Sequence, residues 1–320
     1  MSVPVVAICR AVLGDTKVPG AEVRMGGERA FTRPELLQFI RGASVIVPWV
    51  SEKIDADLLD AAGPQLKAVC NYAVGVDNID LAACKSRGVI VTNTPNAVTE
   101  GTADMAWALI LAVARRLVEA DHFARSPEYG QRGPLGPTDL VGMDLTGKTL
   151  LIVGGGRIGF AVAMRSHGWG MRVLYVSRTK HWDFELAPLA AERVTLEEGL
   201  PRADVVSVHV PLTPETRGLI NAKAFALMKP SAIFVNTARG PIHDEQALVD
   251  ALKAKKLYGA GLDVFEREPL VHADLKTMTN VVLTPHIGSG AAKYREMMTQ
   301  MALDNARAVL AGQPPPNRVV

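Results

Sequence analysis

The stretch KTLLIVGGGRIG, residues 148–159, decides the fold that this chain is expected to adopt. An apolar run leads directly into Gly154, Gly156 and Gly159, which form the pattern GxGxxG, and a helix-like segment follows. The first glycine permits a tight turn, the second lets a phosphate approach the backbone, and the third lets the helix pack closely on the strand. Because N–H groups at the start of such a helix face a pyrophosphate, the stretch predicts a Rossmann dinucleotide-binding unit.

Further apolar runs follow this stretch and continue the alternation of strands and helices. They lie at residues 172–177, 203–211, 232–238, 258–265 and 280–286. Strands that helices cover on both faces are apolar throughout rather than at every second residue. The runs therefore predict one parallel sheet.

The N-terminal part of the chain shows the same alternation. Short β-branched runs lie at residues 3–9, 43–50, 66–75 and 89–95. Helix-like stretches separate them at residues 34–41, 54–63 and 78–88. This alternation predicts a second parallel α/β unit.

A long apolar stretch, residues 101–125, joins the two units and predicts a single helix. Thr99 is a possible N-cap of this helix, and Glu100 lies in its first turn. A loop rich in Gly and Pro is expected over residues 126–139. The amphipathic stretch at residues 291–312 is expected to pack back on the first unit, which would make that unit discontinuous in sequence.

The composition excludes several classes of protein. With 320 residues, 48% of them hydrophobic, the chain has enough apolar material for one large or two ordinary globular domains. A formal net charge of +2 provides no strong field for nucleic acid or an anionic membrane, so neither partner is expected. Cys9, Cys70 and Cys84 lack CxxC spacing and are expected to be buried thiols in a reducing compartment. No uncharged run reaches the roughly 18 residues that span a bilayer, so a cytoplasmic protein is expected.

The turn after the second strand of the glycine-rich unit bears on the choice of cofactor. An Asp or Glu near position 177 would accept hydrogen bonds from the adenosine ribose 2′-OH of NAD. Instead Ser177 and Thr179 offer hydroxyl groups, while Arg178 and Lys180 offer positive charge. These groups suit a phosphate dianion, so NADP(H) is favoured, with NAD(H) possible. The alternative interpretation is a solvated basic turn.

Three ionisable residues stand at or just after the ends of later strand candidates: Arg239, Glu268 and His286. In doubly wound sheets ligands bind outside the carboxyl ends of strands, so the three side chains could converge beside the cofactor. Reduction of a 2-oxo acid needs a cation for the carboxylate, a proton donor for the carbonyl oxygen and a group that tunes this donor. Taken singly, each residue has an ordinary alternative as a surface ion-pair partner, a solvated loop residue or a helix cap.

Several motifs, in one order along nearly the whole chain, make it similar to the D-isomer-specific 2-hydroxyacid dehydrogenases. They are NYAVGVDNID, EGTADMAWALILAVARR, GGGRIG, VPLTPETRGLIN, NTARG, AGLDVFEREP and TPHIGS. The combination of EGTAD, VEADHFAR and the SRT turn most resembles the glyoxylate reductase and hydroxypyruvate reductase branch.

The resemblance implies roles for the three ionisable residues. Arg239 would bind the substrate carboxylate and polarise the carbonyl group. His286 would be the general acid in reduction, and Glu268 would hydrogen-bond it and keep it protonated near neutral pH. The Val74-Gly75 peptide would offer backbone N–H groups to the substrate carboxylate.

The resemblance also implies contacts with the cofactor. Arg157 and Ile158 would cover the pyrophosphate together with the glycines. The other expected contacts are Thr102 near the domain boundary, Pro211 and Thr216 near the adenine, and Thr237 and Asp263 near the nicotinamide.

Two positions depart from the family pattern. Gly155 stands where the family often has a larger residue, and His243 stands where the pattern more often shows an apolar residue. A catalytic role for His243 is not expected. The other histidines form no HxxxH or HExxH pair and the cysteines form no CxxC pair, so no metal site is expected.

Together these observations predict an α/β protein with two doubly wound parallel-sheet domains. Residues 99–286 would form the Rossmann dinucleotide-binding domain, and residues 1–98 with 287–320 a flavodoxin-like substrate domain. The resemblance implies a homodimer that forms through the dinucleotide-binding domains, using the helix near Thr99 and the loop after it.

The expected function is NADPH-preferring reduction of small 2-oxo acids, glyoxylate to glycolate and hydroxypyruvate to D-glycerate. An alternative is the same chemistry on 2-ketogluconate or another 2-oxo acid, since the loop Pro48–Val50 would set selectivity. Phosphohydroxypyruvate is less favoured because little chain follows His286, and formate because its dehydrogenases carry Gln where Glu268 stands. A distant alternative is a corepressor-like nucleotide sensor without enzymatic activity.

Overall fold

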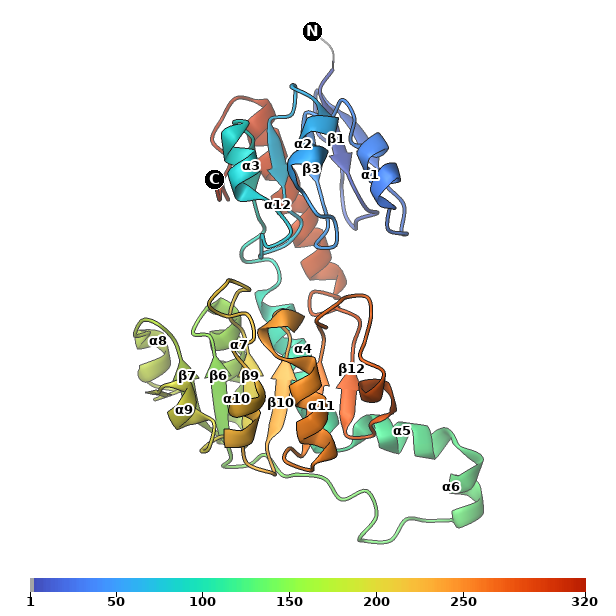
Figure 1. Ribbon diagram of the computed structural model, residues 1–320, viewed down its shortest axis with the longest axis vertical. Coiled ribbons are helices and arrows are strands. Elements are labelled where there is room, and N and C mark those ends of the chain that lie inside the picture. Colours follow the sequence, from blue (N-terminus) through green and yellow to red (C-terminus); the bar gives the residue numbers. More distant parts are fainter. Residues whose placement is uncertain (1–2) are drawn as a thin grey trace. The chain divides into compact units, whose positions relative to one another are not determined.

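The computed structural model describes residues 3–320. The chain forms two compact units. The first unit contains the residues up to Val98 together with Ser289–Val320, and the second contains Thr99–Gly288. In Figure 1 the strands of the first unit are blue, and its C-terminal helix is red.

The second boundary follows Gly288, whereas the sequence predicts it after His286. The N–H groups of Ile287 and Gly288 each donate to the Asp263 carboxylate at 2.8 Å. These bonds hold both residues in the second unit.

The first unit contains a five-stranded parallel sheet of order β2-β1-β3-β4-β5. Its strands are β1 (Val5–Ile8), β2 (Glu22–Met25), β3 (Val45–Val47), β4 (Ala68–Cys70) and β5 (Ile90–Thr92). This is the flavodoxin-like order, as predicted. Only β2 was not expected, because this edge strand is exposed at both ends and none of its residues is fully buried.

Helices cover both faces of this sheet. Helices α1 (Arg33–Phe39), α2 (Ala56–Ala62) and α3 (Leu81–Ser86) pack on one face through a shared apolar core. Asp55 caps α2 and Asp80 caps α3, each accepting a hydrogen bond from a first-turn N–H group. Helix α12 (Ala292–Leu310) contacts β4 within the same unit, which confirms the predicted return of the C-terminal segment.

The second unit contains a seven-stranded parallel sheet of order β12-β11-β10-β9-β6-β7-β8. Its strands are β6 (Thr149–Val153), β7 (Arg172–Val176), β8 (Glu192–Arg193), β9 (Val205–Val208), β10 (Ile233–Asn236), β11 (Gly259–Leu262) and β12 (Val281–Leu283). Counted from β6, the order reverses between β6 and β9, as in the Rossmann fold. The predicted fold class is therefore confirmed. The exposed two-residue strand β8 was not foreseen.

Two apolar cores flank the seven-stranded sheet, and Figure 1 shows the helices that cover its two faces. One is formed with α4 (Thr99–Ala114), α7 (Arg157–Ser166) and α8 (Trp182–Glu185). The other is formed with α9 (Leu196–Gly199), α10 (Ala222–Leu227) and α11 (Glu245–Lys253). Short 3-10 helices lie at η1 (His167–Trp169), η2 (Gly240–Ile242) and η3 (Asp274–Thr277).

The prediction of a single helix over residues 101–125 is wrong, because α4 ends at Ala114 and a separate helix, α5 (Leu117–Arg125), follows it. The Ala114 carbonyl accepts a hydrogen bond from the N–H of Met143 at 2.7 Å, so it is engaged outside the helix. Arg116 then takes a left-handed conformation with φ 51°. A contact distant in sequence therefore breaks the helix.

Two smaller expectations about this region are also wrong. Thr99 is already part of α4 and so is not its N-cap. Within the predicted loop, Pro127–Arg132 forms helix α6, with Pro127 at its first position. Proline suits that position because its missing N–H would have no partner there.

The cysteines are buried thiols, as predicted, and none forms a disulfide. Burial raises the pKa of Cys70 to about 12 and that of Cys84 to about 11. None of the helices in residues 3–320 combines the length and apolar character needed to cross a membrane.

Candidate active site

The glycine-rich turn links β6 to α7 in the second unit. Gly154 has φ 117°, and a Cβ there would lie 2.7 Å from the backbone of His209. A Cβ on Gly159 would lie 2.1 Å from the carbonyl oxygen of Gly154. The first and third glycines are thus required by backbone contacts within the protein itself.

Gly156 differs from the other two glycines because nothing lies within 4 Å of its Cβ position. It is the N-cap of α7, and no side chain caps that helix. Arg157 and Ile158 form the first turn beside this open space. An open backbone at an uncapped helix start is what a pyrophosphate requires, so the turn fits the dinucleotide expected from the sequence.

Ser177, Arg178 and Thr179 lie directly after β7, at the same edge of the sheet as the glycine-rich turn. His181 Nε2 is 3.0 Å from Ser177 Oγ and 3.3 Å from Thr179 Oγ1. Arg193 on β8 donates to the carbonyl oxygens of Ser177 and Arg178. Neither His181 nor Arg193 was predicted to belong to the site.

The loop after β9 contains Pro211 and Thr216. The Thr216 hydroxyl donates to the Pro211 carbonyl at 2.6 Å and accepts from the Thr213 N–H at 2.8 Å. The Thr213 hydroxyl, and more weakly the positive charge of Arg178, lower the pKa of Glu215. The side chain of Arg178 therefore acts electrostatically on this loop, which completes the adenosine end of the candidate cofactor site.

Arg239, Glu268 and His286 follow the neighbouring strands β10, β11 and β12 at the same carboxyl edge. His286 Nδ1 lies 2.8 Å from Glu268 Oε2. Burial opposes ionisation of Glu268, but the hydrogen bond and charge of His286, with the charge of Arg239, place its pKa below the ordinary value. The structure therefore brings the three side chains together, and leaves Nε2 of His286 as the nitrogen that can face a substrate.

The backbone around His286 is held by Asp263, which is 1% exposed. Its carboxylate accepts from the Thr284 hydroxyl at 2.6 Å and from two N–H groups of the loop that follows His286. Burial raises the pKa of Asp263, and those hydrogen bonds oppose the increase. His286 itself has φ 56°, a conformation that non-glycine residues rarely adopt and that needs such support.

Two further predicted contacts lie nearby in the second unit. Thr237 is 7% exposed, and its Oγ1 has no hydrogen-bond partner among the described residues. A buried hydroxyl without a partner suits the amide of a nicotinamide ring. Thr102 on α4 is buried, and its side chain lies 3.4 Å from the Cβ position of Gly288, beside Asp263.

His243, for which no catalytic role was expected, is buried beside the Arg239 loop. Its Nδ1 accepts a hydrogen bond from Asn236 Nδ2 at 3.0 Å, and the same amide donates to the Arg239 carbonyl. Burial lowers the pKa of His243 to about 4, from about 6.5. The residue is thus a neutral support of the loop.

This burial predicts a loss of stability in acid. The unfolded chain binds a proton at His243 below about pH 6.5, whereas the folded chain does so only near pH 4. The free energy of unfolding should therefore fall by about 2 kcal/mol more between pH 7 and pH 5 than it does in His243→Asn, which keeps an acceptor for Asn236. Urea titrations at both pH values measure this difference, and equal losses in the two proteins would contradict it.

Val74 and Gly75 lie in the first unit, in the loop after β4. The Ala73 carbonyl accepts from the Thr94 N–H at 2.9 Å, and the Val74 carbonyl accepts from Asn93 Nδ2 at 2.8 Å. In a trans peptide the N–H points away from the carbonyl of the same plane. The N–H groups of Val74 and Gly75 therefore point away from these anchors and can serve a ligand.

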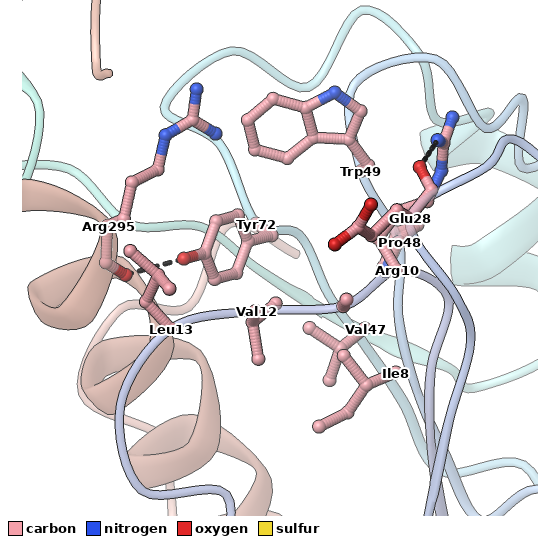
Figure 2. A pocket seen from close by; sticks show the side chains of 11 residues that line it. Ile8, Arg10, Val12, Leu13, Glu28, Val47, Pro48, Trp49, Tyr72 and Arg295 are labelled. Atoms are coloured by element: carbon pink, nitrogen blue, oxygen red, sulfur yellow. Dashed lines mark hydrogen bonds between the residues drawn. The ribbon is translucent and has the colours of Figure 1, made fainter. Parts of the chain in front are cut away.

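A cavity of about 340 Å³ lies in the first unit, at the carboxyl ends of β1 and β3 (Figure 2). Its lining includes the loop residues Pro48 and Trp49. Tyr72 also lines the cavity, and its hydroxyl donates to the backbone carbonyl of Arg295. The Arg295 guanidinium lies 4.4 Å from the centre of the Trp49 ring.

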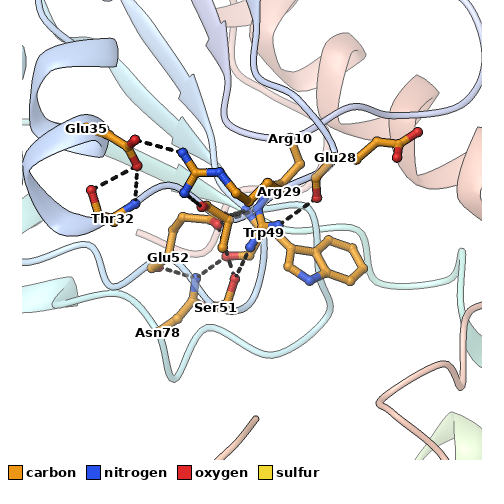
Figure 3. Close-up of polar contacts among 10 residues, drawn as sticks. Arg10, Glu28, Arg29, Thr32, Glu35, Trp49, Ser51, Glu52 and Asn78 are labelled. Carbon is orange, nitrogen blue, oxygen red and sulfur yellow. Dashed lines mark hydrogen bonds and ion pairs between the residues drawn. The ribbon is translucent and has the colours of Figure 1, made fainter.

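A polar network fixes the loop that carries Trp49 (Figure 3). Glu52 is buried and accepts from Arg10 Nε at 2.8 Å and from the Trp49 N–H at 2.5 Å. Asn78 Nδ2 donates to the carbonyl oxygens of Trp49 and Glu52. The loop that the sequence suggested for selectivity is therefore a rigid part of the cavity.

No group of three or more His, Cys, Asp and Glu side chains in residues 3–320 is arranged to hold a metal ion.

Comparison with known proteins points to one family. The family described as "D-isomer specific 2-hydroxyacid dehydrogenase, NAD binding domain" matches residues 107–288. A glyoxylate reductase of Thermococcus onnurineus is 49% identical over 293 residues, which cover 91% of this chain and 87% of that protein.

The chain is also similar to solved structures over nearly its whole length. The TT0316 protein of Thermus thermophilus has a TM-score of 0.92 and 45% identity, covering 99% of this chain and 100% of the other. An NADPH-dependent glyoxylate/hydroxypyruvate reductase of Sinorhizobium meliloti, in complex with NADP and malonate, has a TM-score of 0.84 and 31% identity, covering 100% and 97%. The chain therefore belongs to the D-isomer specific 2-hydroxyacid dehydrogenase family and is an NAD(P)-dependent dehydrogenase.

Proposed function

We propose that the protein is an NADPH-preferring reductase that converts glyoxylate to glycolate and hydroxypyruvate to D-glycerate. The observation that carries the proposal is the 2.8 Å contact between His286 and Glu268, beside Arg239, at the sheet edge that also bears the glycine-rich turn. Curated relatives that are 44–49% identical are named glyoxylate reductases, which supports glyoxylate as a substrate.

In this proposal each side chain has one task. The bound nicotinamide supplies the hydride. Arg239 holds the substrate carboxylate and polarises the carbonyl group, and His286 gives the proton on Nε2 to the carbonyl oxygen. Glu268 accepts from Nδ1, orients the ring and favours its protonated form. The N–H groups of Val74 and Gly75 add hydrogen bonds to the carboxylate.

We also propose roles for the two units. The second unit would hold the dinucleotide along Gly154–Gly159, with Thr102, Thr237 and Asp263 near the nicotinamide. The first unit would select the substrate, and the chain would form a homodimer through its dinucleotide-binding units.

The proposed preference for NADPH rests on Ser177, Arg178 and Thr179, where no carboxylate is present to repel a 2′-phosphate. Arg178→Asp is expected to lower the NADPH to NADH ratio of kcat/KM by about tenfold or more, because it removes a charge-assisted contact and adds a repulsive charge. Initial rates with both cofactors measure the ratio. A change of less than about twofold would contradict the assignment, and Lys223→Asp, at an exposed position on α10, is the matched charge control.

The cavity of about 340 Å³ favours a second candidate substrate class. Glyoxylate carries no side chain, so it leaves such a space empty. The aromatic and aliphatic lining, which also includes Arg10, can instead hold the chain of a larger 2-oxo acid such as 2-ketogluconate.

A panel of initial rates tests the proposal. It compares glyoxylate, hydroxypyruvate, 2-ketogluconate and pyruvate at neutral pH, each with NADPH and NADH, and uses Arg239→Ala as the blank. Fast NADPH-linked reduction of glyoxylate or hydroxypyruvate that is lost in the blank would support it. Preferred reduction of 2-ketogluconate would favour the second class, and NADPH binding without turnover of any acid would favour a nucleotide sensor.

A further inference from the structure

We propose that His181 forms part of the site for the ribose 2′-phosphate of NADPH, and that binding of this phosphate takes up a proton at its imidazole ring. The inference rests on the proposed preference for NADPH. It goes beyond that preference because it names a further residue and makes selectivity between the two cofactors depend on pH.

The position of the ring is the first argument. Nε2 of His181 contacts both hydroxyl groups that are expected to bind the phosphate, at 3.0 Å from Ser177 and 3.3 Å from Thr179. A phosphate that accepts hydrogen bonds from these hydroxyls displaces their contact with Nε2. The imidazole nitrogen then lies next to an anion, where a protonated ring is favoured.

The space for the ring is the second argument. A Cβ on Gly155 would lie 2.8 Å from Cδ2 and 3.1 Å from Nε2 of His181. The imidazole therefore occupies the volume that a side chain at position 155 would fill. The His181 ring therefore needs a glycine at position 155, at the start of the proposed dinucleotide site.

Two aromatic neighbours and a backbone hydrogen bond also hold the His181 ring in place. Tyr175 and Phe184 lie edge-on to it, with ring centres 6.2 Å and 6.1 Å away. The backbone N–H of His181 donates to the Tyr175 hydroxyl at 3.1 Å, and this hydroxyl donates to the Glu185 carboxylate at 2.8 Å. The side chain is therefore fixed toward the glycine-rich turn before any ligand arrives.

Charge balance is the third argument. The charged groups on the surrounding elements at this edge of the sheet are Arg157 on α7, Arg178 and Lys180 on the same loop, Asp183 and Glu185 on α8, Glu192 and Arg193 on β8, and Glu215 after β9. Lys180 is paired with Glu185 at 2.7 Å, so these two charges cancel. Glu192 is paired with Arg202. Three arginines, one aspartate and one glutamate remain, a net charge of one positive unit, whereas a phosphate monoester carries about −1.5 to −2 at neutral pH. A protonated His181 supplies the missing positive charge.

The test compares the intact protein with His181→Asn, which keeps a polar side chain but does not titrate. Calorimetric titrations with NADP⁺ and NAD⁺ at pH 6, 7 and 8, in buffers that differ in ionisation enthalpy, give both the affinities and the protons taken up. The 2′-phosphate also titrates near pH 6, but it contributes equally to both proteins. Only the difference between them reports on His181.

We expect the NADP⁺ to NAD⁺ affinity ratio to rise several-fold more from pH 8 to pH 6 in the parent than in His181→Asn, because proton uptake at His181 favours NADP⁺ binding at the lower pH. NADP⁺ should take up more protons in the parent, and NAD⁺ binding should show no such difference. Gly155→Ala provides a second variant, because its methyl group forces the imidazole to move while His181 is retained. It should weaken the same pH dependence.

An identical pH dependence in the parent and both variants, with NADP⁺ still preferred, would overturn this inference and leave the proposed cofactor preference intact. Equal affinity of the parent for NADP⁺ and NAD⁺ at every pH would overturn both. Should His181→Asn fail to fold, Gly155→Ala decides the matter alone.

Discussion

His286→Asn is expected to lower kcat for reduction of a 2-oxo acid about a thousandfold. The amide of Asn can form a hydrogen bond, but it has no ionisable proton to transfer to the carbonyl oxygen. Binding of NADPH should be retained, because the glycine-rich turn and the Ser177 loop are unchanged. Steady-state rates with glyoxylate, together with NADPH binding measured by fluorescence, separate these two effects.

Glu268→Gln is the matched variant, since its amide oxygen can still accept from His286 Nδ1 but carries no charge. The low pKa of Glu268 arises in part from the hydrogen bond and the positive charge of His286. Glu268→Gln should therefore lower kcat less than His286→Asn does, because its amide oxygen still orients an imidazole that can donate a proton. If His286→Asn kept more than about a tenth of the parent kcat, the role of His286 as proton donor would be wrong.

Gly240→Ala is expected to destabilise the fold by about 3 kcal/mol or more. Gly240 follows Arg239, and a Cβ there would lie 1.9 Å from the carbonyl carbon and oxygen of Phe265 and 2.5 Å from the N of Glu266. All of these atoms belong to the backbone, so no side chain can move aside. The methyl group would push the loop with Arg239 away from the loop with Glu268.

Chemical denaturation of the variant measures this cost. Gly168→Ala is the control, because Gly168 belongs to the same unit and has nothing within 4 Å of its Cβ position. That substitution should change the free energy of unfolding by no more than about 0.5 kcal/mol. Equal effects of the two substitutions would show that the close backbone contact at Gly240 does not determine stability.

The fold could be predicted because buried parallel strands leave a direct trace in the sequence. Each fully buried strand of either sheet was expected from its apolar run, whereas the exposed edge strands β2 and β8 were not. The end of α4 could not be predicted, because it depends on a hydrogen bond between Ala114 and Met143. An N–H group that arrives from a distant loop leaves no local pattern.

The candidate site also contains some residues whose positions could be predicted from the sequence and others whose positions could not. Because Arg239, Glu268 and His286 each follow a strand, parallel topology places them at one edge of the sheet, and the sequence could indicate this. The positions of His181 and Gly240 could not be foreseen, because each depends on a backbone or ring from another segment. The sequence of the turn that carries Ser177 and Thr179 has no pattern from which the imidazole beside these residues could be predicted.

The first unit is completed by residues that are synthesised after the whole second unit. The Val91 N–H donates to the Val320 carbonyl at 3.1 Å, the Val319 N–H donates to the Val91 carbonyl at 2.7 Å, and α12 packs on β4. During translation, residues 99–288 therefore leave the ribosome while the apolar strands β4 and β5 still lack these partners. Exposed strands in a nascent chain are prone to aggregation, so chaperones that bind apolar segments would protect the first unit until α12 has emerged.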